Sequence, residues 1–176
     1  MLFSDRSLWT MLHGLVLSGG ALMLLFVALF ALRVMAAPQG AAVSARQSNA
    51  FAWITVAAAT LLWLSVIGGT YIVFPMYRAT PPEGIASLAG YPRALLTASD
   101  DTRWLHAFAM EIKEHMPWIA AMLATAAAFI ARRHRTTLLS DAALRRVTGS
   151  LLVTVIGLVS FVALLGVFVN KVAPLW

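Results

Sequence analysis

The chain has 176 residues, of which 61% are hydrophobic and 11% charged, and its mean hydropathy is +0.84. This composition excludes an ordinary soluble domain and predicts an integral membrane protein. The absence of cysteine excludes disulfides, thiolate zinc sites and cysteine-ligated iron–sulfur clusters. The net charge of +6 does not predict nucleic-acid binding, because the basic residues gather at the ends of apolar segments rather than along one face.

Four apolar stretches are long enough to cross a hydrocarbon core, which takes about 20 helical residues. They cover residues 8–32, 51–74, 104–131 and 147–169. The alternating pattern of a membrane barrel is missing, and a lipid-exposed backbone must satisfy its own hydrogen bonds, so each stretch is predicted to be a helix. We therefore predict an all-α integral membrane protein, with residues 1–176 forming a single four-transmembrane-helix bundle.

The first predicted helix carries His13, and Tyr71, Tyr77 and Arg78 lie at the external end of the second. Pro75 is expected to end the second helix. Small residues in these two helices mark positions where neighbouring helices can approach closely, and they are Gly14, Ser18, Ala21, Ala58, Ser65, Gly68 and Gly69. The adjacent glycines at 19 and 20 and those at 68 and 69 also leave room for a flat ligand, although packing is the more common role.

A long loop over residues 77–103 follows, punctuated by proline and glycine. We expect one short helical turn at residues 92–97 and a cap on the third helix at Ser99 or Asp100. The loop is interpreted as a surface segment lying on the bundle, with a docking surface for an external partner as the alternative.

Arginine distribution predicts the topology. The two connections at residues 33–46 and 132–146 hold seven arginines and a single acid, whereas the opposite side is nearly balanced. Positively charged loops stay in the cytoplasm, so both termini and the 77–103 loop are predicted to be external. In a bacterium the protein would lie in the inner membrane with these parts in the periplasm.

The third predicted helix opens with a charged turn, Glu111, Lys113, Glu114 and His115, and contains Pro117, where a kink is expected. Counting about 20 residues back from the cytoplasmic arginines places this turn at the external membrane boundary. On the other helices His13, Tyr71 and Arg78 fall at the same level, and His106 lies above it.

Ionisable residues inside a membrane usually face the bundle interior and mark a site. We therefore expect a ligand, proton or redox site here, with Glu111 and Glu114 as proton-handling groups and Glu111 favoured because it shares a helix face with His115. The alternative is an interfacial rim in which Glu111 and His115 pair along one face while Lys113 extends outward to the membrane surface.

Two histidines on different helices at one depth, His13 and His115, are candidate axial ligands for the iron of haem b. In its size, helix number and histidine pair the chain resembles four-helix membrane b-type cytochromes and quinone-reactive membrane anchor subunits. That resemblance implies an electron-transfer role, with His106, Tyr71 and Arg78 as further cofactor-binding residues. It covers no diagnostic motif.

Three other interpretations stay open. A quinone site needs only a donor such as His115 or His13, a carboxylate as proton acceptor and aromatic walls. A copper site could use methionines together with these histidines, namely Met11, Met110 and Met116. The chain could also be a non-catalytic structural or assembly subunit.

We therefore expect a membrane subunit of a respiratory or electron-transfer complex, surrounded by lipid and by other membrane subunits. Its external face would meet a cytochrome or another electron carrier. With no soluble domain, the chain is not expected to be an enzyme by itself, although it could be part of an oxidoreductase complex.

Overall fold

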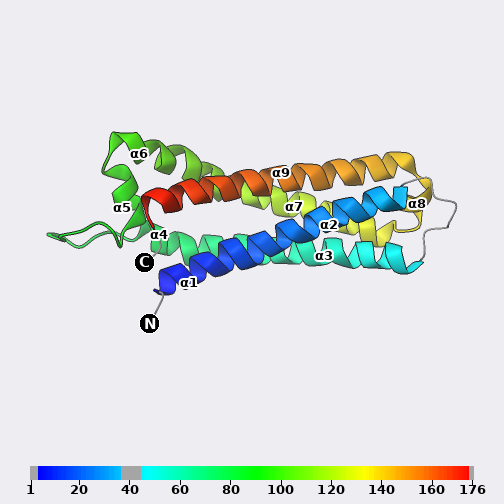
Figure 1. Ribbon diagram of the computed structural model, residues 1–176, viewed down its shortest axis with the longest axis horizontal. Helices are drawn as coiled ribbons and strands as arrows, with labels where there is room; N and C mark the ends of the chain where they lie inside the picture. Colours follow the sequence, from blue (N-terminus) through cyan, green and yellow to red (C-terminus); the bar gives the residue numbers. More distant parts are fainter. Residues whose placement is uncertain (1–3, 37–44, 175–176) are drawn as a thin grey trace.

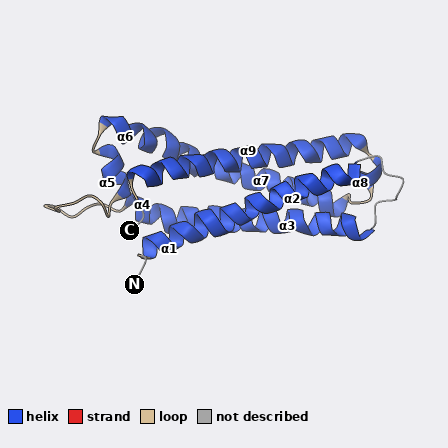
Figure 2. Ribbon diagram, in the orientation of Figure 1, coloured by secondary structure: helices blue, strands red, loops and turns tan. Residues whose placement is uncertain are grey.

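A computed structural model describes residues 4–36 and 45–174, leaving aside the side chain of Leu139. Within these ranges the chain is helical and has no strand (Figure 2). Four helices in the described ranges are long and apolar enough to cross a membrane, and they are Asp5–Ala36, Ala45–Arg78, Asp100–Arg133 and Ala142–Val172. Each contains one of the four predicted spans, which confirms the predicted all-α, four-helix architecture.

These long helices, numbered first to fourth in chain order, surround a common core (Figure 1). Each packs against the next in sequence, and the fourth closes the ring by packing against the first. The first and third helices therefore lie diagonally across the bundle from each other.

The first three long helices each change from α to π geometry over one short segment and then back. The first consists of α1 (Asp5–Met11), η1 (Leu12–Ser18) and α2 (Gly19–Ala36). The second consists of α3 (Ala45–Gly68), η2 (Gly69–Val73) and α4 (Phe74–Arg78). The third consists of α6 (Asp100–Trp104), η3 (Leu105–Met110) and α7 (Glu111–Arg133). The fourth long helix is the single α-helix α9 (Ala142–Val172). Short helices α5 (Pro92–Thr97) and α8 (Thr137–Ser140) lie in the connections.

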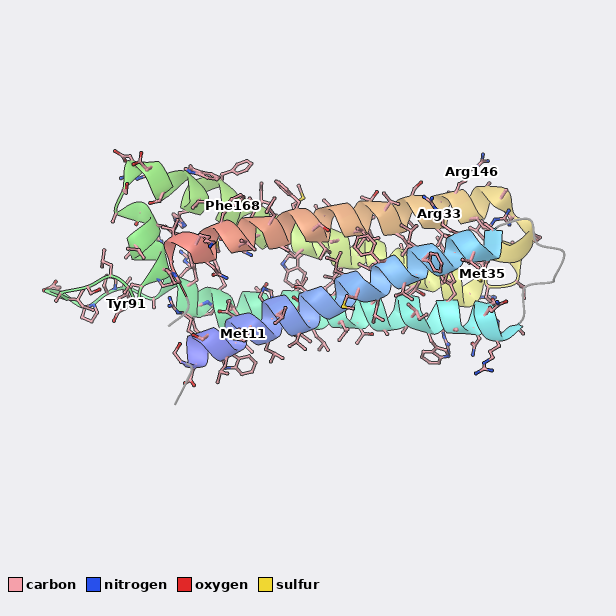
Figure 3. All side chains as sticks on the ribbon, in the orientation of Figure 1. Met11, Arg33, Met35, Tyr91, Arg146 and Phe168 are labelled. Carbon is pink, nitrogen blue, oxygen red and sulfur yellow. The ribbon has the colours of Figure 1, made fainter. Side chains whose placement is uncertain are left out.

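The two ends of the bundle carry different elements. Residues 4 and 174 share one end with α5 and α6, which we call the terminal end, and there Arg6 donates a hydrogen bond of 2.9 Å to the carbonyl of Pro174 (Figure 1). The opposite end, called the arginine end, holds α8 and the labelled Arg33 and Arg146 (Figure 3).

The core between the helices is built largely from small residues. On α7 the buried face consists of alanines, at positions 120, 121, 124, 127, 128 and 131. Because alanine lets helix backbones approach closely, these positions bring α7 against its neighbours α3 and α9. Larger side chains, among them Leu25, Phe51 and Leu152, are buried in the same core.

The prediction that Pro75 ends the second helix is wrong, since the helix continues to Arg78. Proline removes a hydrogen-bond donor and its ring meets the carbonyl four residues earlier. Here the π-helical segment Gly69–Val73 directly precedes the proline turn. A π turn is wider and moves the hydrogen bonds by one residue, so the chain can accommodate Pro75 without ending the helix.

Two predictions about the long loop are confirmed. A single short helix occupies Pro92–Thr97, and the Ser99 side chain caps α6 by accepting a hydrogen bond of 3.3 Å from the Asp101 amide. Residues 79–91 are irregular, and Gly84 adopts a φ of 74°, which favours glycine. The segment between the second and third long helices is therefore shorter than the predicted loop, because both helices extend into it.

Candidate functional site

His13 connects the first and second long helices. Its Nδ1 lies 2.8 Å from the carbonyl oxygen of Ser65, while the Ser65 hydroxyl donates to the carbonyl of His13 at 3.1 Å. The hydroxyl oxygens of Ser18 and Ser65 are 2.6 Å apart, which extends the network by one residue. Ser65 is buried, so these polar groups satisfy one another within the bundle.

The same network determines which nitrogen of His13 is available. If Nδ1 carries the proton and donates to the Ser65 carbonyl, every donor in the set has an acceptor, and this tautomer is assigned from that pattern. Nε2 then keeps a free lone pair. Histidines that bind metals or accept protons in proteins are commonly held through their other nitrogen in this way.

Gly69 provides the space that the imidazole of His13 occupies. A Cβ on Gly69 would come within 2.6 Å of the His13 Cε1 and 3.0 Å of its Nδ1, so the imidazole would have to shift to admit it. By contrast, a Cβ on the adjacent Gly68 would meet nothing within 4 Å. Gly69 therefore accommodates a flat group, as the sequence suggested, but this group is the His13 ring of the first helix.

Lys113 points into the bundle rather than outward to the membrane surface, contrary to the rim interpretation. Its ammonium nitrogen lies only 3.0 Å from the position that a Cβ on Gly166 of α9 would take. It is also near enough to His13 for the two groups to interact electrostatically. Within the described residues no carboxylate lies within 4.0 Å of this ammonium, so the charge has no ion-pair partner there.

Glu111 and His115 share a face, as predicted, but that face is turned outward. Their side chains are 68% and 72% exposed, and the His115 Nδ1 lies 2.8 Å from the Glu111 carbonyl and 4.0 Å from its carboxylate. Residues on an α-helix turn about 100° per position, so Lys113 lies roughly opposite both of them. Turning Lys113 inward therefore turns Glu111 and His115 away from the core.

The structure does not bring His13 and His115 together. His13 packs between the first and second helices, whereas His115 is exposed on the third, which lies diagonally across the bundle from the first. Tyr71 is 70% exposed, and the guanidinium of Arg78 lies 5.4 Å from the ring centre of Phe74. In the described structure no hydrogen bond joins either of these two residues to the His13 network.

His106 belongs to a second polar group at the terminal end. Its Nδ1 lies 2.8 Å from the hydroxyl of Tyr77, which is buried. Tyr77 also interacts electrostatically with Arg93 of α5 and with Glu114. Glu114 is partly buried, unlike Glu111, so of the two predicted carboxylates it is the one associated with a buried hydroxyl.

The three π-helical segments all lie in the terminal half of the bundle and carry the residues described above. His13 belongs to η1, Gly69 to η2 and His106 to η3. Because π-helical turns distort the hydrogen-bond ladder, they are uncommon and are frequent at functional sites. Sequence reasoning missed these segments, as well as the hydrogen bonds of Ser18 and Ser65, which it treated only as small residues.

Among the described residues no group of three or more His, Cys, Asp or Glu side chains could hold a metal ion. Haem iron needs only two imidazoles, so this finding concerns clustered sites rather than haem.

Comparisons with protein-family models, with curated proteins and with solved structures gave no match for this chain.

Proposed function

We propose that this chain is a membrane subunit of a respiratory or electron-transfer complex, with a quinone site in the terminal half of the bundle. The observation that carries the proposal is the inward ammonium of Lys113, which lies against Gly166, interacts with His13 and has no ion-pair partner among the described residues. A cation inside an apolar bundle is unfavourable, so such residues usually serve binding or transfer.

The chemistry of the two groups suits a quinone headgroup. An ammonium offers three hydrogen-bond donors, and a quinone carbonyl is an acceptor that gains negative charge on reduction. Nε2 of His13 can accept the proton that a quinol hydroxyl releases on oxidation. Glu114, near Tyr77 and His106, is the better placed carboxylate to pass that proton onward, because Glu111 is exposed on the outer face.

Topology forms part of the same proposal. The concentration of arginines at one end predicts that the arginine end is cytoplasmic and the terminal end external, and in a bacterium this would be the periplasmic side of the inner membrane. Quinol oxidation at the terminal end would then release protons outside. An external cytochrome or other electron carrier would dock over the 79–99 segment.

Photoaffinity labelling tests the quinone site. The full-length chain in lipid nanodiscs is irradiated with a photoreactive benzoquinone that bears an isoprenoid tail. Lys113→Met should lower labelling by at least about tenfold, because a hydrogen bond to a charged group contributes roughly 1.5–3 kcal/mol. His13→Gln should lower it severalfold, because a neutral hydrogen bond contributes roughly 0.5–1.5 kcal/mol. Lys171→Met, which removes an exposed lysine from the end of α9, is the matched control. Unchanged labelling in both site variants would leave the chain as a structural subunit.

Haem b is the second candidate, supported by the geometry of His115. Its Nδ1 is held by the Glu111 carbonyl at 2.8 Å, which leaves Nε2 directed away from the chain. Such a haem would be shared with a histidine of a neighbouring subunit. The intact complex should then show a reduced-minus-oxidised b-type band that His115→Ala abolishes and His134→Ala leaves. Loss of the band in both His13→Ala and His115→Ala would instead support the pairing predicted from the sequence.

A further inference from the structure

We propose that the arginine end carries a binding site for the phosphate headgroup of an anionic phospholipid, between the second and third long helices. A cavity of about 580 Å³ lies there, lined by Asn49, Ala52 and Trp53 from α3, by Arg132 and Arg133 from α7, and by Arg135, which follows α7. None of the described residues that line it is acidic. This site is independent of the proposed quinone site at the opposite end.

Two of the arginines are held in place by the second helix. The guanidinium carbon of Arg132 lies 4.2 Å from the ring centre of Trp53, a cation–π contact. Arg135 donates to the Asn49 side chain at 3.4 Å, and its carbonyl accepts a hydrogen bond of 3.4 Å from Ser48. Both long side chains are thus partly ordered before a ligand binds, which lowers the entropic penalty of binding.

The arginines lack an acidic partner in the described part of the chain. Neither Arg132, Arg133 nor Arg135 forms a salt bridge there. Asp141, the acid of the neighbouring connection, caps α9 instead, accepting from the amides of Ala143 and Leu144 at 2.8 and 3.1 Å. The cavity therefore concentrates positive charge that an anion can neutralise.

A lipid headgroup fits this setting better than a free anion. The site lies at the last turn of an apolar long helix, beside Trp53, and indole rings favour the level of lipid headgroups. Trp53 in the lining and Phe129, about one turn before Arg132 and Arg133 on α7, are 52% and 61% exposed and offer an apolar surface for acyl chains. Basic pockets between membrane helices are the usual binding sites of anionic lipids. The arginine guanidinium binds phosphate through bidentate hydrogen bonds.

If lipids were attracted only by the total positive charge of this end, replacing any of its arginines would lower lipid retention equally. An arginine outside the cavity therefore provides a matched control. Lipid binding to the full chain in detergent is measured by native mass spectrometry with cardiolipin, phosphatidylglycerol and phosphatidylcholine. We expect retention of the two anionic lipids and not of phosphatidylcholine. Arg132→Gln and Arg133→Gln should each weaken retention about fivefold, since one basic residue contributes about 1 kcal/mol. Arg146→Gln, which removes the same charge outside the cavity, should change it less than twofold.

Further measurements keep the proposal testable if an arginine variant is poorly folded. Asn49→Asp adds a carboxylate within the cavity without removing an arginine, and it should lower anionic-lipid retention by a similar factor. Inorganic phosphate at millimolar concentration should not displace the lipid. Displacement by phosphate would assign the site to a free anion. Equal losses in Arg146→Gln and Arg132→Gln, or equal retention of all three lipids, would show diffuse charge attraction and overturn the site.

Discussion

The imidazole of His13 and the backbone of Gly69 lie in direct contact across the first and second long helices, so that a Cβ at Gly69 would meet the His13 Cε1 at 2.6 Å. Each residue also belongs to a π-helical segment, Leu12–Ser18 and Gly69–Val73 respectively. The contact joins two helices at the level where both leave α geometry, and its disruption gives the first prediction.

Gly69→Ala should destabilise the protein by about 1–3 kcal/mol, because the new methyl group displaces the His13 ring and its hydrogen bond to Ser65. Thermal unfolding in detergent, followed by circular dichroism, measures the effect. Gly68→Ala is the control: its Cβ meets nothing within 4 Å, and alanine is the better helix former. A Gly69→Ala protein as stable as Gly68→Ala would contradict the contact.

His13 and Ser65 should be energetically coupled. The Ser65 hydroxyl oxygen lies 3.0 Å from the His13 Nδ1, so the two side chains also contact each other directly. In a double-mutant cycle with His13→Ala and Ser65→Ala, we expect this contact to give a coupling free energy of about 0.5–1.7 kcal/mol, the range for polar contacts between membrane helices. His13→Ala combined with Thr60→Ala is the control cycle, because the Thr60 hydroxyl bonds to the Val56 carbonyl of its own helix at 3.0 Å. Additive effects of His13→Ala and Ser65→Ala would mean that the contact between their side chains contributes nothing to stability.

Lys113→Met should stabilise the fold and impair function at the same time. The substitution keeps a long apolar side chain and removes an inward charge, and charged residues inside membrane helices are disfavoured by about 2.5–3.5 kcal/mol on insertion scales. The melting temperature is expected to rise while quinol-dependent turnover of the complex falls. Lys171→Met should alter neither quantity. A lower melting temperature for Lys113→Met would show that the ammonium is satisfied by a partner outside the described residues.

The two carboxylates of the charged turn should behave differently. Glu111 is exposed and its carboxylate is 4.0 Å from the His115 ring, so Glu111→Gln is expected to leave turnover almost unchanged. Glu114 interacts with the buried Tyr77, and Glu114→Gln should reduce turnover severalfold if it passes protons. Quinol-dependent rates of the assembled complex distinguish the variants. A loss confined to Glu111→Gln would restore the role predicted from the sequence.

Single-cysteine labelling tests the topology, and it needs no background substitution because the chain has no cysteine. Cysteines within residues 80–100 should react with an impermeant thiol reagent in intact cells. Cysteines within residues 36–48 and 133–143 should react only after the membrane is opened. The reverse pattern would place the proposed quinone site on the cytoplasmic side.

Local sequence determined the number and the approximate positions of the long helices. The length of the apolar stretches predicted four spans, and each lies within one long helix of the structure. Turn-forming residues predicted the short helix Pro92–Thr97 and the cap of α6 at Ser99. These features depend on composition and on nearest neighbours along the chain. For the same reason, Glu111 and His115 could be assigned to one face from their spacing of four residues.

Which face of the third helix is turned inward was decided only by tertiary structure. The spacing that joins Glu111 to His115 also places Lys113 opposite them, and the sequence reading turned the wrong one of these two faces inward. Packing decides it: the stripe of alanines on α7 meets α3 and α9, and Lys113 lies against Gly166 across that contact. Likewise, Pro75 ends a helix by local rules, but the π-helical turn before it lets the helix continue. The rotation of a helix about its axis and the formation of a π-helical turn depend on contacts with residues distant in sequence. The residue pattern of a single helix does not contain this information.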